Sequence, residues 1–186
     1  MPLQVYSPPI NCYEMVSQNL EYLNILVQDK QEENYLEMTK PLPIYDVHLS
    51  DELKQGRVHP QLTGWRCFVM KNNEAISMAD IAVHETGENP EFLYFTKGDI
   101  VEKILNKICE IESQDIIKND HFEVRLLRIS SVSLLAIWLH GSNQELIYPI
   151  DKKLSEKAPY NFSQIFENIT EQLKSIDEVG PLTPPQ

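Results

Sequence analysis

Residues 122–150 read FEVRLLRISSVSLLAIWLHGSNQELIYPI, and this stretch decides the fold. Phe122–Ile129 alternates apolar and polar side chains, as a strand with one buried face does. Ser133–His140 is apolar on both faces, which predicts a strand in the middle of a sheet, covered on both sides. After a Gly-Ser-Asn turn comes Leu146–Ile150. Its Pro149 indicates an edge strand or a strand end, because proline has no N–H to donate.

Upstream of this stretch, a β-hairpin is expected. Alternating side chains in 65–70 and 75–84 predict two strands, and Asn72-Asn73 between them suits a tight turn, since Asn tolerates left-handed backbone angles. Residues 91–95 are expected to add a short strand. Residues 44–49 alternate only weakly and are compatible with another short strand, and residues 50–53 are compatible with one helical turn, which Gly56 would close.

Helical periodicity predicts three amphipathic helices. The first covers residues 11–28 and is left open to continue to Met38, before Pro41 and Pro43 end it. The second follows Thr96, its expected N-cap, and ends before Lys118.

The third helix is expected to begin after Asn161. Asn161 is its expected cap, with Gln164 at the third helical position.

Together these elements predict an α+β fold. The expected sheet is mainly antiparallel, has about five strands, and carries packed helices in the order α-β-β-α-β-β-β-α. Residues 1–10 are expected to be an extended segment, and residues 11–178 a single α+β domain in which 11–38 form a helical arm. Residues 179–186 are expected to be a disordered, Pro-rich tail.

Charge disfavours several classes of partner. The chain has 28 acidic and 16 basic residues, a net charge of −12, and no basic run. Nucleic acids and anionic membranes bind proteins largely through Lys and Arg, so neither is an expected partner. The longest apolar run, Val132–Leu139, is far shorter than the roughly 20 residues of a membrane-spanning helix.

The cysteines and the N-terminus indicate a cytoplasmic protein. Cys12, Cys67 and Cys109 are odd in number and widely spaced, which matches neither a disulfide framework nor a zinc site. The first residues lack the basic and apolar regions of a signal peptide. Cys12 lies near the expected start of a helix, where a thiol pKa can fall, but no base partner is evident, so the inert interpretation is favoured.

No motif assigns a catalytic residue, a cofactor or a metal. The five histidines lack zinc-site spacing, there is no nucleophile elbow, and six glycines include no phosphate-binding loop. Enzymatic activity is therefore undecided, and a non-enzymatic role is favoured.

A few residues are candidate contacts for a ligand or partner. Residues 72–96 contain five acids and no Lys or Arg, which indicates a solvated face or, more specifically, a docking surface for a basic protein. Arg125 lies within a strand and needs a partner there; an ion pair across strands is favoured over recognition of a carboxylate ligand. The candidate residues are His84, Glu85, Glu88, Glu91, Arg125 and His140.

These observations favour a non-enzymatic cytoplasmic module that binds or regulates another protein. One specific form is an acidic inhibitor or immunity-type protein directed at a basic enzyme. Exchange of the helical arm between two copies would give a homodimer. The alternative is a small-molecule-binding protein or an enzyme with a pocket between helix and sheet, for which His84, Arg125 and His140 are the first candidates.

Overall fold

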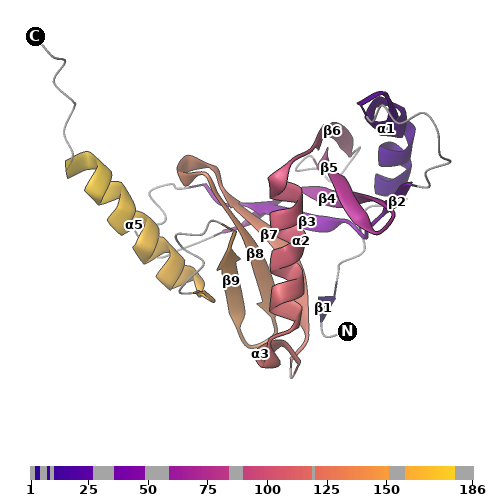
Figure 1. Cartoon of the computed structure of the whole chain (residues 1–186). Helices are drawn as coiled ribbons and strands as arrows, with labels where there is room; N and C mark the ends of the chain where they lie inside the picture. The colour runs from indigo at the N-terminus through magenta and orange to yellow at the C-terminus, as the bar shows by residue number, and fades with distance from the viewer. Residues whose placement is uncertain are drawn as a thin grey trace, which may run out of the picture.

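One mixed sheet of nine strands organises the chain, and helices cover both of its faces (Figure 1). The computed structural model describes residues 3–4, 8, 11–26, 36–48, 59–83, 90–118, 120–150 and 158–178. The main path of the sheet has the order β6-β5-β4-β3-β7-β8-β9, with β1 paired to β7 and β2 to β4. The strands are β1 (Leu3–Gln4), β2 (Leu36–Met38), β3 (Leu42–Asp46), β4 (Gln61–Lys71), β5 (Glu74–Ala82), β6 (Glu91–Thr96), β7 (Phe122–Ile129), β8 (Leu134–Gly141) and β9 (Glu145–Pro149).

The expected α+β class is confirmed, but the sheet is larger than expected and is not wholly antiparallel. β3 runs parallel to β7 from Ile44 to Asp46, and β1 also pairs with β7 in parallel. The order of elements differs too, because β1, β2 and β3 precede the hairpin and join the same sheet. Pro43 has no N–H to donate to a neighbouring strand. It lies opposite Trp65 of β4, and on the other side the pairing with β7 begins only at the next residue, Ile44, so β3 tolerates the proline.

The two antiparallel units of the sheet agree with the sequence. β4 and β5 form a hairpin, and both residues of its Asn72-Asn73 turn have positive φ, 52° and 66°. β7, β8 and β9 pair in antiparallel order, so β8 lies inside the sheet and β9 ends its path, as expected. Ser133, expected in the strand, instead has φ 52° at the turn before β8.

The helices are α1 (Cys12–Leu26), α2 (Asp99–Glu112), α3 (Asp115–Lys118) and α5 (Phe162–Glu178). Continuation of the first helix to Met38 is wrong, since residues 36–38 form β2 against β4. Thr96 is not the cap of α2; it ends β6, and Gly98, with φ 102°, takes the N-cap position.

The Asn161 cap of α5 is confirmed, and Gln164 completes a capping box with it. Asn161 Oδ1 accepts from the Gln164 N–H, and Gln164 Oε1 accepts from the Asn161 N–H, both at 2.9 Å.

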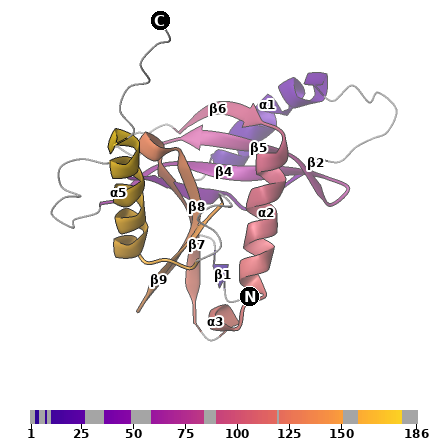
Figure 2. The same ribbon diagram turned by 60° about the vertical axis from the view of Figure 1, so that its left-hand side comes forward.

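Two faces of the sheet carry different helices. α2 packs on a core that includes Ile44, Leu126 and Ile137. The residues that alternate with these point to the other face, where Leu127 and Trp138 pack with α5 and Trp65 packs with α1. α1 contacts β6 and α5 contacts β9, so these two helices lie at opposite ends of the sheet (Figures 1 and 2).

Two ion pairs lie on the α2 side of the sheet. Arg66 binds Asp80 through two hydrogen bonds of 2.6 and 2.7 Å, and only 6% and 2% of their side chains are exposed. Asp80 is therefore a buried ion-pair partner rather than part of an acidic surface.

The second ion pair joins Asp46 to Arg128 across β3 and β7. Arg128 donates to both carboxylate oxygens of Asp46 at 2.9 and 2.6 Å, and Thr63 donates to one of them at 2.7 Å. Burial alone would raise the pKa of Asp46, but the bonds from Arg128 and Thr63 outweigh it and hold that pKa below its usual value.

Other expectations lie partly outside the described residues. The helical turn at 50–53 and the tail at 179–186 fall on positions that the structure does not describe. Among the helices that it describes, none combines the length and apolar character needed to cross a bilayer.

Candidate functional site

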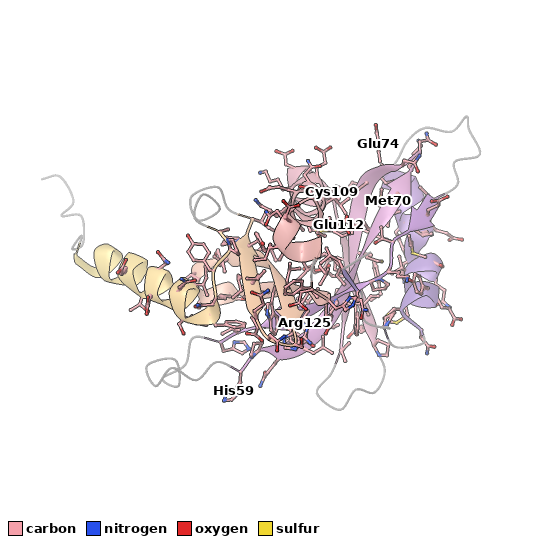
Figure 3. The ribbon with its side chains drawn as sticks, turned by 90° about the horizontal axis from the view of Figure 1, so that it is seen from below. His59, Met70, Glu74, Cys109, Glu112 and Arg125 are labelled. Atoms are coloured by element: carbon pink, nitrogen blue, oxygen red, sulfur yellow. The ribbon has the colours of Figure 1, made fainter. Side chains whose placement is uncertain are left out.

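The sheet brings two of the predicted contact residues, Arg125 and His140, to one face. In the β7–β8 ladder Glu123 lies opposite His140, and Arg125 lies opposite Trp138, so all four side chains share the face that also carries α1 and α5. Figure 3 shows Arg125 on the side of the sheet away from α2, between α5 and α1.

A row of ionisable side chains crosses three strands here. Glu123 of β7, His140 of β8 and Glu145 of β9 are successive partners across the sheet. His140 Nδ1 lies 2.9 Å from Glu145 Oε1. The side chain of His140 is 40% exposed and that of Glu145 is 35% exposed. The imidazole thus stands between two carboxylates at the surface.

Arg125 is held between two aromatic rings. Its guanidinium carbon lies 4.7 Å from the centroid of Tyr45 and 4.6 Å from that of Trp138. Each such cation–π contact contributes about 0.5–2 kcal/mol, with the larger values for desolvated cations. Only 13% of the Arg125 side chain is exposed, so these contacts fix its position.

One carboxylate partially neutralises Arg125. Nη2 donates to Glu123 Oε2 at 2.6 Å, which confirms an intramolecular ion pair but places both partners on one strand rather than across strands. Nε is buried and has no hydrogen-bond partner, and the bond to Glu123 is the one hydrogen bond that this side chain makes to the described residues. A guanidinium has five N–H donors, so Arg125 retains donors that are not used within the described part of the chain.

Trp138 is the centre of the aromatic surroundings. Tyr45 meets it edge-on at 5.1 Å, Phe162 of α5 at 5.2 Å and His140 at 5.5 Å. Trp138 itself is 3% exposed, and its buried Nε1 has no hydrogen-bond partner among the described residues. Because α5 supplies Phe162, the end of the helix that follows the Asn161 cap helps to fix the ring positions.

We call this region the Arg125–His140 surface. It consists of Tyr45, Glu123, Arg125, Trp138, His140 and Glu145. With a neutral imidazole it carries two carboxylates and one guanidinium, a formal charge of −1. Trp, Tyr and Arg are the residue types that most often dominate binding energy at protein interfaces. Trp138 and Arg125 are largely buried, so the side chains of this surface that are most open to a partner are His140 and Glu145, together with the partly exposed Tyr45.

Glu91, another of the predicted contact residues, does not join this surface. His84, Glu85 and Glu88 lie outside the described residues. Glu91 is exposed at the start of β6, at the opposite end of the strand path from β9. In the described ranges, no three His, Cys, Asp or Glu side chains come together in a way that could hold a metal ion.

The cysteines do not form an activated site. Cys12 and Cys67 are buried in the core beneath α1, and burial raises their pKa values to about 11 and about 12. A thiol with such a pKa is almost entirely protonated near neutral pH and is a poor nucleophile. Cys109, on α2, is exposed.

Sequence reasoning missed Tyr45. Only a weak alternation marks residues 44–49, and the contact with Arg125 depends on the parallel pairing of Tyr45 with Leu127, between strands about 80 positions apart in sequence. No protein-family model, no curated protein and no solved structure matches this chain.

Proposed function

We propose that this protein is a non-enzymatic module that binds another protein through the Arg125–His140 surface. The observation that carries the proposal is Arg125 held between Tyr45 and Trp138 with unused donors. A side chain fixed in this way loses little conformational freedom when it meets a partner, which lowers the entropic cost of binding.

The partner of this proposal is a basic protein. The chain has a net charge of −12, and the surface itself presents Glu145 and Glu123 beside His140. Complementary charge steers association and suppresses like-charged competitors. An acidic inhibitor or immunity-type role fits this description, and the cytoplasmic setting expected from the cysteines belongs to the same proposal.

The test compares two matched charge reversals. Glu145→Lys changes a carboxylate on the Arg125–His140 surface, in a side chain that is 35% exposed. Glu110→Lys changes a carboxylate on α2, on the other face of the sheet, in a side chain that is more exposed, at 57%. Both variants have the same net charge, so a difference between them reports position.

The tagged chain is used to capture partners from its source cells at low salt, and each captured protein is then purified and titrated. We expect a basic protein whose dissociation constant rises about tenfold for Glu145→Lys and is nearly unchanged for Glu110→Lys. We also expect binding to weaken as salt increases. The proposal would be contradicted if the two reversals changed the dissociation constant equally, or if neither of them changed it.

The second candidate is binding of a small carboxylate. Arg125 favours it, because its guanidinium makes one hydrogen bond to the described residues, to Glu123, and a guanidinium binds carboxylates through its N–H groups. Titration of the protein with mono- and dicarboxylates, followed by NMR at Arg125, tests this candidate. Saturable shifts at Arg125 that Glu145→Lys leaves unchanged would favour the small ligand over the basic protein.

A further inference from the structure

The two margins of the sheet are not equivalent. At the β9 margin, Tyr160 pairs with the outer edge of β9. The Ile147 N–H donates to Tyr160 O at 2.7 Å, and the Tyr160 N–H donates to Ile147 O at 2.9 Å. β6 forms the other margin and pairs with β5 alone among the described strands. Figure 2 shows β6 at this margin, beside α1.

β6 lacks most of the features that protect an edge strand. Its sequence, Glu91-Phe-Leu-Tyr-Phe-Thr96, contains four consecutive large apolar residues and no proline or lysine. Charged residues, proline and a covering element are the usual protections against pairing with another chain. The strand has two protective features: the charged Glu91 at its start, and a bulge that leaves Leu93 without a partner in β5.

The bulge does not bury the apolar side chains. Leu93 and Tyr94 are 46% and 49% exposed, and they are neighbours on the same free strand. Leu93 and Tyr94 belong to a small group of exposed large apolar side chains in the described part of the chain. Two members of this group are therefore adjacent on the edge strand, where their apolar area is costly to leave in water.

The charges at the ends of β6 are self-complementary. Glu91 begins the strand and Lys97 follows its last residue. If two copies pair in antiparallel order about Tyr94, Glu91 of each lies opposite Lys97 of the other. Parallel pairing would instead place Glu91 against Glu91, which is repulsive. The charges thus select the arrangement that a twofold axis generates, and a twofold dimer is closed and does not extend into a filament.

We infer that β6 is a docking edge for a second copy of this chain, and that two copies form a twofold dimer with a continuous sheet. The contact is small, because the strand has six residues and its bulge limits regular pairing. Small interfaces below about 1,200 Å² are typical of weak association, and the net charge of −12 on each copy opposes it. The dimer is therefore weak, forms at high protein concentration, and gains stability when salt screens the overall repulsion.

The test is sedimentation velocity of the full chain over a wide concentration range. We expect a monomer–dimer equilibrium that Leu93→Lys and Tyr94→Lys each weaken by at least about tenfold. Ile116→Lys is the matched control, because Ile116 of α3 is 44% exposed and lies away from β6. It makes the same change of charge at similar exposure and is expected to leave the dissociation constant unchanged.

A charge exchange tests the register. Glu91→Lys alone and Lys97→Glu alone each place like charges opposite one another and weaken the dimer, whereas the double variant restores it. A chain that is monomeric at every concentration would overturn the inference. A dimer insensitive to Leu93→Lys and Tyr94→Lys, or a double variant as weak as the single ones, would also overturn it. The outcome is independent of the Arg125–His140 surface, whose strands do not include β6.

Discussion

Replacing Asp80 with Asn should lower the free energy of unfolding more than the same removal of one carboxylate charge does at an exposed position. The variant removes the charge of Asp80 while leaving Arg66 buried, with 6% of its side chain exposed. In the wild type, two hydrogen bonds of 2.6 and 2.7 Å join this guanidinium to the Asp80 carboxylate. Loss of one partner of a buried pair costs about 3–5 kcal/mol in the free energy of unfolding, because the remaining charge is uncompensated.

The assay is urea unfolding followed by tryptophan fluorescence. With a denaturant slope of about 2 kcal/mol per molar, this loss lowers the urea midpoint by about 1.5–2.5 M. Glu110→Gln is the control: it removes an exposed pair with Lys107 and should cost less than about 0.5 kcal/mol. The double variant Arg66→Met/Asp80→Leu should lose less than Asp80→Asn, since it leaves no unpaired charge. Equal midpoints for Asp80→Asn and Glu110→Gln would refute the reasoning.

Two further predictions concern the titration of named groups. Because the folded-state pKa of Asp46 is lowered, its pair with Arg128 stabilises the protein above the unfolded pKa of about 3.9 and loses that contribution as the pH falls below it. At neutral pH, the free energy of unfolding of Asp46→Asn should therefore be lower than that of the wild type, and in acid the two values should approach each other. Urea midpoints of both proteins at several pH values measure this. A difference in the free energy of unfolding that stays constant with pH would contradict the prediction. In the native protein, a thiol reagent should modify the exposed Cys109 rapidly and should modify the buried Cys12 and Cys67 only after unfolding. Mass spectrometry of the labelled peptides measures this order. Labelling of Cys12 or Cys67 in the native protein would contradict the prediction.

Local signals in the sequence predicted those parts of the fold that depend on near neighbours. The Asn72-Asn73 turn follows from the tolerance of Asn for positive φ, and the cap of α5 follows from the spacing of Asn161 and Gln164. The strand Phe122–Ile129 has the bounds that its alternation predicts. In each case the deciding interaction lies within a few residues of the pattern that reveals it.

The remaining features depend on pairing between distant segments. Nothing local to Leu42–Asp46 specifies that this strand runs parallel to β7, and the expectation of a mainly antiparallel sheet did not include this parallel pair. The same pairing brings Tyr45 to Arg125, so the aromatic side of the candidate surface was missed together with it. Arg125 was recognisable because a guanidinium on a strand requires a partner, although its partner, Glu123, lies on the same strand.

The proposal that the Arg125–His140 surface binds a protein is tested most directly by photo-crosslinking in the source cells. A photoreactive amino acid replaces His140, which is 40% exposed on the surface, or Glu110, which is 57% exposed on the other face of the sheet. We expect a discrete covalent adduct with a basic protein from position 140 and none from position 110. No adduct from position 140, or the same adducts from both positions, would contradict the account.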